Sequence, residues 1–156
     1  MDLLLTHGYF LHDDPKELQI MKPYAPLGIL YLSSYLRSKG FDVEVFDSTF
    51  SSLEELRKAL SSAPPAVLGV YANLMTRTNV ANILKAAKEA GWTTVVGGPE
   101  PAAYVEEYLA AGADFVVIGE GEATLEELLS AWKAGAQSGL QNIAGLAFLD
   151  DGRNLR

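Results

Sequence analysis

Short apolar runs alternate along the chain with longer stretches in which apolar residues recur at helical spacing. Residues 3–5 form the first run, and residues 42–46 form a second one in which polar and apolar positions alternate. The later runs, 67–71, 94–96 and 115–118, are continuously apolar. Continuous runs are typical of strands covered on both faces, whereas alternation is typical of a strand near a sheet edge. The pattern therefore predicts five β-strands.

Helices are predicted in the intervening stretches, starting near residues 26, 52, 76, 101 and 124. From Val80 onward, apolar residues fall at i, i+3, i+4, i+7 and i+10, and Gly91 ends the helix. Ser52 and Thr124 are each followed three residues later by Glu, which is the spacing of a capping box at a helix start. The stretch 26–39 begins with proline and is rich in Leu and Tyr, so we expect it to be largely buried.

Five strands linked by helices predict the α/β class. The expected architecture is a doubly wound, flavodoxin-like parallel sheet with right-handed crossovers, strand order 2-1-3-4-5 and three α/β/α layers. A further run, 145–149, is followed by Asp150, Asp151 and Gly152. It predicts an extra C-terminal strand that enters a turn whose partner strand is missing.

The composition bounds the class of protein. The 156 residues are 49% hydrophobic and 21% charged, as in one globular domain, which excludes disordered and fibrous classes. Without cysteine the chain holds no disulfide, thiolate zinc site, cysteine nucleophile or iron–sulfur cluster of its own. The net charge of −8 disfavours nucleic acid and anionic membranes as partners. Neither a signal peptide nor a membrane helix matches the sequence, so we expect a soluble cytoplasmic domain.

Candidate chemistry lies in the loops that follow the strands, because ligands of such sheets bind beyond the carboxyl ends of the strands. The loop after the first strand is unusually long. We interpret its two histidines, His7 and His12, as exposed loop residues and predict no metal site. The loops after the fourth and fifth strands are rich in glycine, which lets a ligand lie against the backbone.

Together these loops predict a flat, nearly uncharged bed for a large ligand. It consists of Gly28, Asn73, Gly97, Gly98, Gly119 and Gly121. No Ser-His-Asp order, P-loop or GxGxxG is present, which disfavours hydrolysis, nucleoside triphosphates and standard dinucleotide binding. We assign no catalytic residue to this chain.

Several segments together carry a family resemblance. They are 26–32 (PLGILYL) with Leu36, 40–43 (GFDV), Gly69 and Val70 ahead of Thr76, 95–101 (VVGGPEP), 114–122 (DFVVIGEGE) and 143–147 (IAGLA). In these segments the chain resembles the N-terminal cobalamin-binding domains of cobalamin-dependent radical SAM enzymes. The resemblance covers nearly the whole chain.

The resemblance implies a cobalamin cofactor whose corrin ring lies at the carboxyl edge of the sheet, with the nucleotide tail inside the domain. The cofactor-binding residues it implies are Thr6, His7, Gly8, Tyr9, Pro26, Leu27, Gly28, Asn73, Leu74, Met75, Thr76, Gly97, Gly98, Pro99, Glu100, Gly119, Glu120, Gly121 and Glu122. Neither histidine fits the D-x-H-x-x-G motif of other cobalamin domains. We therefore expect base-off cobalamin whose lower face is covered by loop residues, with Tyr9, Phe10 and Met75 as candidates.

The resemblance also implies a longer parent protein. Residues 1–142 would be the cobalamin-binding domain, and residues 143–156 would start the connection to a C-terminal radical SAM barrel that this chain lacks. The barrel would be the domain's partner and would bring S-adenosylmethionine, a [4Fe-4S] cluster and a small-molecule substrate. The expected reaction of the parent is methyl transfer or a ring-forming oxidation of the tetrapyrrole-cyclase type, whereas this chain alone performs no radical chemistry.

Three alternatives to this interpretation have different sequence requirements. A flavin-binding module needs a Ser- and Thr-rich phosphate cradle after the first strand, which the segment 6–10 (THGYF) does not offer. A phospho-receiver needs an Asp ending the third strand and a Lys ending the fifth, and the chain has neither. The third alternative, a flavodoxin-like scaffold or interaction domain that binds no corrinoid, stays open and is separated by a corrinoid titration.

Overall fold

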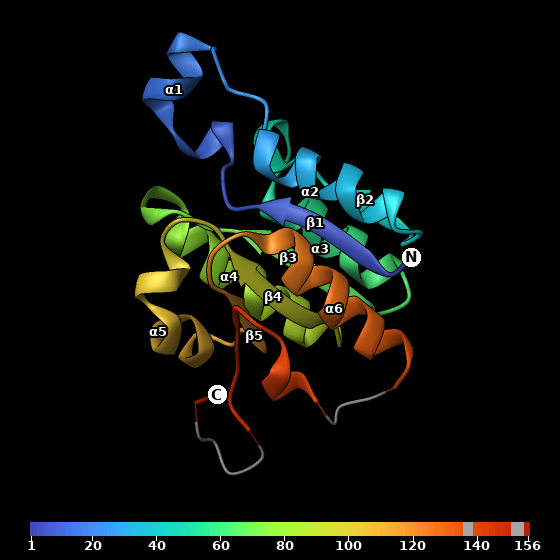
Figure 1. Cartoon of the computed structure of the whole chain (residues 1–156). Helices are drawn as coiled ribbons and strands as arrows, with labels where there is room; N and C mark the ends of the chain where they lie inside the picture. The colour runs from blue at the N-terminus through green and yellow to red at the C-terminus, as the bar shows by residue number, and fades with distance from the viewer. Residues whose placement is uncertain (136–138, 151–154) are drawn as a thin grey trace.

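The core of the molecule is one mixed sheet, seen in a computed structural model that describes residues 1–135, 139–150 and 155–156 (Figure 1). Its strands are β1 (Leu3–His7), β2 (Val43–Val45), β3 (Val67–Tyr71), β4 (Thr93–Gly97), β5 (Phe115–Val117) and β6 (Leu146–Ala147), in the order β2-β1-β3-β4-β5-β6. The first five strands are parallel, and β6 pairs antiparallel with β5. The predicted order 2-1-3-4-5 with an extra C-terminal strand is confirmed.

Helices cover both faces of the sheet, as the three-layer prediction requires. The helices of the described chain are α1 (Pro15–Ile20), which lies off the sheet, and α2 (Leu27–Ser38), α3 (Leu53–Ser62), α4 (Arg77–Glu89), α5 (Val105–Ala110) and α6 (Gly121–Lys133), which cover it. Short 3-10 turns are η1 (Leu11–Asp13), η2 (Ser48–Phe50), η3 (Leu74–Thr76), η4 (Pro101–Ala103) and η5 (Leu140–Asn142). Helices α2 and α6 pack on one face, and α3, α4 and α5 on the other.

Alternation along the strands sends side chains into two apolar layers. Leu3 and Leu5 of β1 join the layer under α2 and α6, whereas Leu4 joins the layer under α3 and α4. Burial of each such side chain contributes about 1.5–3 kcal/mol. In β2 only Val43 is buried and Glu44 is exposed, as the alternating pattern predicted for an edge strand.

The two predicted capping boxes have different outcomes. At α3 the Ser52 hydroxyl accepts from the Glu55 amide at 3.2 Å, and the Glu55 carboxylate accepts from the Ser52 amide at 3.0 Å. At α6 the prediction is wrong, because the helix begins at Gly121 and Thr124 lies inside its first turn. The Thr124 hydroxyl instead donates to the carbonyl of Ala144 at 2.8 Å, which ties α6 to the segment before β6.

Two segments before β2 differ from the sequence prediction. Helix α2 is less buried than expected, because only one stripe faces the sheet, and Leu27 and Tyr31 are 73% and 65% exposed. The long loop after β1 contains a helix, α1, none of whose residues is buried. Asp14 followed by Pro15 is the local signal that identifies its start, since Asp is a favoured N-cap and Pro a favoured first residue.

The C-terminal run continues beyond β6. Leu149 makes an isolated antiparallel bridge with Leu155, and Phe148 and Arg156 exchange two backbone hydrogen bonds, so the described end of the chain pairs with this run and corrects the expectation of a missing partner. The predicted turn at Asp151 and Gly152 lies outside the described residues. The division at residue 142 stays a prediction. In the described part of the chain, no helix has the length and apolar character needed to cross a membrane.

Candidate functional site

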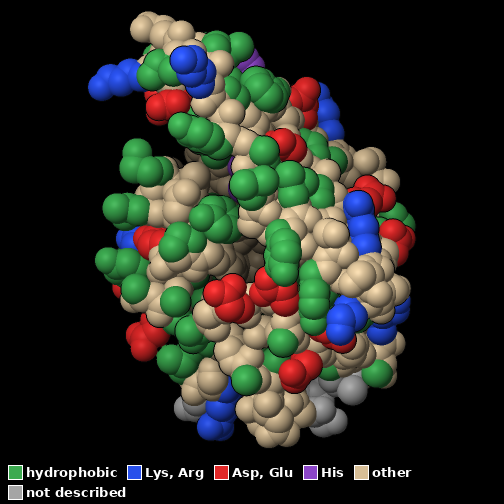
Figure 2. Space-filling view, turned by 45° about the horizontal axis from the view of Figure 1, so that its top comes forward, with side chains coloured by type: hydrophobic (Ala, Val, Ile, Leu, Met, Phe, Trp, Pro, Cys, Tyr) green, Lys and Arg blue, Asp and Glu red, His purple; other side chains and the backbone are tan. Residues whose placement is uncertain are grey.

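A cavity of about 640 Å³ opens at the carboxyl ends of β1 and β3. His7 ends β1 and Tyr71 ends β3, and both line the cavity. The chain leaves β1 toward α2 on one face and leaves β3 toward α4 on the other, so the cavity lies at the switch point of the doubly wound sheet, where ligands of such folds bind. Figure 2 shows the hollow beneath the projecting segment that carries α1.

The loops after β1 and β3 supply most of the lining. Of the predicted site residues, those that line the cavity are His7, Gly8, Tyr9, Pro26, Leu27, Gly28, Asn73, Met75 and Thr76. Lining residues that the sequence did not single out as ligand contacts are Asp13, Asp14, Glu17, Pro23, Tyr24, Ala25, Ile29, Thr49, Tyr71 and Asn79. The unusual length of the loop after β1 was the only sequence signal for many of them.

His7 is buried, with 4% of its surface exposed, which corrects the expectation of an exposed loop histidine. Its Nδ1 accepts a hydrogen bond from the Tyr9 amide at 3.2 Å, and its Nε2 lies 3.0 Å from Oδ1 of Asp47. An accepting Nδ1 places the ring proton on Nε2, which then donates to Asp47. Both ring nitrogens are therefore engaged, whereas His12 is exposed on η1 and does not line the cavity.

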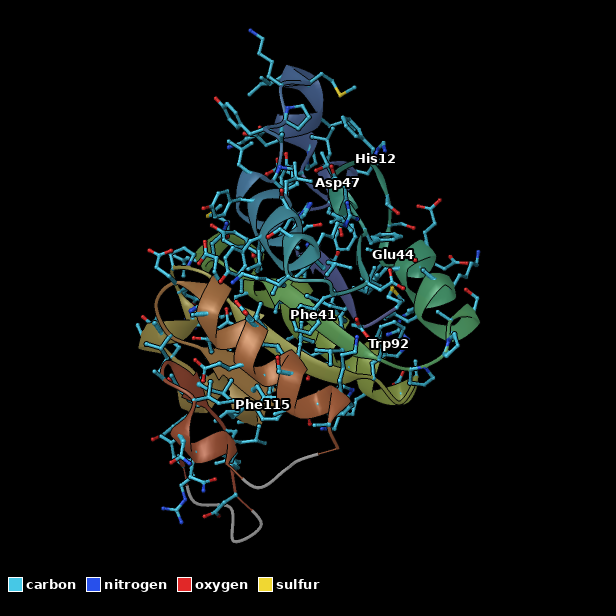
Figure 3. All side chains as sticks on the ribbon, turned by 45° about the vertical axis from the view of Figure 1, so that its right-hand side comes forward. His12, Phe41, Glu44, Asp47, Trp92 and Phe115 are labelled. Carbon is cyan, nitrogen blue, oxygen red and sulfur yellow. The ribbon has the colours of Figure 1, made fainter. Side chains whose placement is uncertain are left out.

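Asp47 anchors His7 from the segment after β2, at the end of the molecule that carries α1 (Figure 3). Its Oδ1 also accepts from the Thr49 amide at 3.0 Å. Burial alone would raise the pKa of the Asp47 carboxyl, but hydrogen bonds from Thr49 and His7 outweigh it and lower the pKa. Asp47 is thus held as a carboxylate that fixes the orientation of the imidazole.

The loop after β1 is pinned to the start of α4. Asn79 donates from Nδ2 to the Gly8 carbonyl at 3.0 Å. A Cβ on Gly8 would lie 2.8 Å from Val80 Cγ2 and 2.9 Å from Thr76 Cβ, so only glycine fits. Asn73 and Thr76 cap η3 reciprocally, as the N-cap interpretation of this loop predicted. These contacts give the cavity a fixed floor.

The three residues proposed to cover a corrin face have different environments. Phe10 is 3% exposed and packs in the core, although it also lines the cavity. Tyr9 is half-buried in the cavity wall, and Met75 is 87% exposed. Tyr9 and Met75 therefore offer more surface to a ligand than Phe10 does.

One wall of the cavity is acidic, unlike the nearly uncharged bed that the sequence predicted. Asp13, Asp14 and Glu17 line it, and no Lys or Arg is among the described lining residues. Asp14 accepts from the backbone amides of Lys16 and Glu17 at 3.0 and 3.1 Å and so caps α1. Burial, followed by the negative charges of Glu17 and Asp14, raises the pKa of Tyr9.

The glycine-rich loop after β4 packs against the chain and does not line the cavity. Gly98 has φ +121°, and a Cβ there would lie 2.3 Å from the Ala72 carbonyl oxygen. The missing side chain thus makes room for the neighbouring backbone, and ligand contact at Gly98 stays a prediction. A Cβ on Gly97 would meet nothing closer than Val117, at 3.6 Å.

Glu100, a predicted ligand residue, is buried in a polar cluster of its own. Arg77 donates from Nε to Oε1 of Glu100 at 2.6 Å, and its guanidinium lies 4.3 Å from the ring centroid of Tyr104. Tyr108 donates to Oε2. Burial and this hydrogen bond raise the pKa of Tyr108, so it keeps its proton. The cluster joins the starts of α4 and α5.

The remaining predicted residues lie at the carboxyl edge of the sheet or beside it but outside the cavity lining: Thr6, Leu74, Pro99, Gly119, Glu120, Gly121 and Glu122. Thr6 is buried and hydrogen-bonded to Phe46 and Ser48. Glu120 is the N-cap residue of α6. Among the described residues no cluster of His, Asp and Glu has the make-up of a metal site.

Large apolar side chains stand exposed around the same edge. They are Tyr24 (92%), Leu27 (73%), Leu74 (69%), Met75 (87%) and Ile118 (43%), hereafter the apolar rim. They come from the loops after β1, β3 and β5, which meet at this edge. A group of exposed apolar side chains beside a cavity is typical of a binding surface.

A family model and a protein of known sequence match most of this chain. The model of the B12 binding domain family matches residues 20–129. An uncharacterized methyltransferase of Pyrococcus horikoshii, PH0819, is 30% identical over 136 residues, which are 82% of this chain and 28% of that protein. The chain thus spans less than a third of this relative.

A solved structure shares the fold. It is TsrM from Kitasatospora setae, a radical S-adenosylmethionine methyltransferase with cobalamin and a [4Fe-4S] cluster bound. The superposition has a TM-score of 0.78 and 23% identity and covers 98% of this chain and 30% of TsrM.

Proposed function

The chain belongs to the B12 binding domain family, and from that premise we propose that it binds a cobalamin at the carboxyl edge of its sheet. The observation that carries the proposal is the cavity at the switch point together with the apolar rim beside it. The bound cofactor supplies methyl-transfer or redox chemistry at its cobalt. The chain itself binds and orients it.

The residues present fit such a group. The cavity has an ordinary volume for a ligand site, where about 300–1,000 Å³ is typical. A corrin ring with its nucleotide tail is larger than this, so part of the molecule would enter the cavity and the rest would lie over the apolar rim. Leu27, Leu74 and Met75 offer apolar contact area for the ring face.

Binding is proposed to be independent of histidine, with the cofactor base-off. Support comes from His7, whose two ring nitrogens are held by the Tyr9 amide and by Asp47. A ligand to cobalt needs a free imidazole nitrogen, and freeing Nε2 would break its hydrogen bond to Asp47. Tyr9 and Met75 remain as the side chains that cover the lower face.

The proposal extends to a longer protein. A C-terminal radical SAM barrel, with S-adenosylmethionine and a [4Fe-4S] cluster, would use the cofactor in methyl transfer or oxidative cyclisation of a small molecule in the cytoplasm. Support for this is the share of the relatives that the chain spans, 28% of PH0819 and 30% of TsrM. Since the chain has no cysteine, the cluster would be held by the barrel.

Titration of the 156-residue chain with methylcobalamin, followed by the corrin absorption bands, tests the proposal. We expect saturable binding with a base-off spectrum that persists in His7→Gln and His12→Gln. Absorption is the better readout, because Trp92 lies at the opposite end of the sheet from Asp47 (Figure 3), and Trp132 lies near the C-terminal end of α6, outside the cavity lining.

A cavity-filling variant makes the test specific. A Cβ on Gly28 has only Tyr71 Cε2 within 4 Å, at 3.9 Å, so Gly28→Leu fills the cavity without a backbone clash. We expect it to abolish binding and leave the melting temperature unchanged. Ser34→Leu, exposed on the same helix, is the matched control and should bind as the wild type. Absence of binding by the wild type would favour a corrinoid-free scaffold.

A further inference from the structure

The acidic wall carries charge that the protein does not neutralise. Among the described residues, neither Asp13 nor Glu17 forms an ion pair. Asp14 is occupied as the N-cap of α1. The other polar groups of the lining include Asn73, Thr76 and Asn79, which are uncharged. The cavity therefore presents a negative potential to whatever enters it.

The acidic wall lies outside the stretch of the chain that matches the B12 binding domain family. All three carboxylates precede residue 20, where the matched stretch begins. They lie on η1 and α1, the segment that projects over the hollow in Figure 2.

A corrinoid has chemically different parts, and the acidic wall attracts some of them and repels others. The ring is cationic and carries amide side chains whose N–H groups donate to carboxylates in charge-assisted hydrogen bonds. The nucleotide tail carries an anionic phosphodiester, which three carboxylates repel. At about 8 Å and with the dielectric constant of water, one unit charge changes a dissociation constant by about twofold at low salt.

We propose that Asp13 and Glu17 select and orient the corrinoid by charge. The wall takes the amide-bearing edge of the ring and keeps the phosphate of the tail on the side away from α1. This inference rests on the proposed function and names the ligand feature that the cavity favours, a cationic, amide-rich corrinoid edge.

Two ligands distinguish the effect of the acidic wall on the corrin ring from its effect on the nucleotide tail. Methylcobinamide has the ring, amides and methyl group of methylcobalamin but lacks the nucleotide tail with its phosphate. The ratio of Kd for methylcobalamin to Kd for methylcobinamide therefore isolates the effect of the wall on the tail. We expect Asp13→Asn and Glu17→Gln each to lower this ratio about twofold, and the double variant about fivefold.

A control for a distant charge is Glu89→Gln, which removes one negative charge at the C-terminus of α4, where Glu89 forms an exposed ion pair with Arg57 at the opposite edge of the sheet. It should leave the ratio unchanged. As a second measurement on the unmodified chain, raising NaCl from 50 mM to 500 mM should lower the ratio, because salt screens the wall.

The outcomes are distinct. If both corrinoids bind but the ratio is unaffected by the substitutions and by salt, the charge selection is wrong and the proposed function stands. If neither corrinoid binds the wild type, both are wrong, because the wall then faces no corrinoid.

Discussion

The two halves of the carboxyl edge of the sheet are built in opposite ways. Over β1 and β3, bulky loop residues leave a cavity and stand exposed around it, as Tyr24 and Met75 do. Over β4 and β5, glycine-rich loops are closed by contacts within the chain. Gly98 packs on the Ala72 backbone, and Glu100 is buried between Arg77 and Tyr108.

The difference shows which group the glycine residues after the strands accommodate in this fold. A glycine after a strand permits close approach, but the approaching group here is a neighbouring strand end. Space for a ligand instead comes from the long loop after β1, which α1 and the segment before α2 hold away from the sheet. Ligand contact and tight chain packing are thus divided between the two halves.

The largest effect should come from forcing a side chain into the closed half. Gly98→Ala places a Cβ at 2.3 Å from the Ala72 carbonyl oxygen, with φ at +121°. We expect a loss of about 3 kcal/mol of unfolding free energy, measured by urea denaturation. Gly97→Ala, with 3.6 Å to its nearest neighbour, is the control and should change stability little. An equally stable Gly98 variant would contradict the division into halves.

Removal of the buried carboxylate should have the next largest effect. Glu100→Ala leaves Arg77 and Tyr108 without their shared partner. Because Arg77 is 42% exposed and can be resolvated, we expect about 2 kcal/mol of destabilisation rather than more. Thermal unfolding measures it, with exposed Glu106→Ala of α5 as the control. A stability loss equal to the control's would show that the cluster does not hold this half closed.

The open half should show the reverse behaviour. Leu74 and Met75 are 69% and 87% exposed, so the double alanine variant should change stability by less than about 0.5 kcal/mol. It should weaken methylcobalamin binding about tenfold, because the ring loses apolar contact area. Isothermal titration calorimetry measures this, and Leu155→Ala, exposed away from the cavity, is the control. Unaltered affinity would remove η3 from the binding surface.

The smallest effect concerns the Asp47 carboxylate beneath the cavity. Its pKa is lowered in the folded chain, so it stabilises the fold above its unfolded pKa, near 4, and this contribution is lost as pH falls through the folded pKa. The side chain is 49% exposed, so solvent screening limits the effect to below about 1 kcal/mol. Asp47→Asn should be less stable than wild type at pH 7, and urea titrations should show this difference shrinking as the pH falls below about 4. A constant difference across this range would refute the linkage.

The sequence by itself determined the strands, their order and most helices. The burial of a strand can be predicted from its local sequence, because a strand covered on both faces must be apolar at consecutive positions, as in 115–118. The stripe from Val80 likewise fixed α4, since helical spacing alone decides which residues meet the sheet. The connection of strands by helices then restricts the topology to the doubly wound form.

Only the tertiary structure decided where the site lies. The bond between His7 and Asp47 joins residues 40 apart, and the bond between Thr124 and Ala144 joins residues 20 apart, so no local pattern reveals either. The same holds for Gly98. Glycine is expected there whether a ligand or a neighbouring backbone segment approaches, so the sequence does not distinguish the two. Local sequence records which side of an element is buried, but which loops meet beyond the strands depends on how distant segments pack.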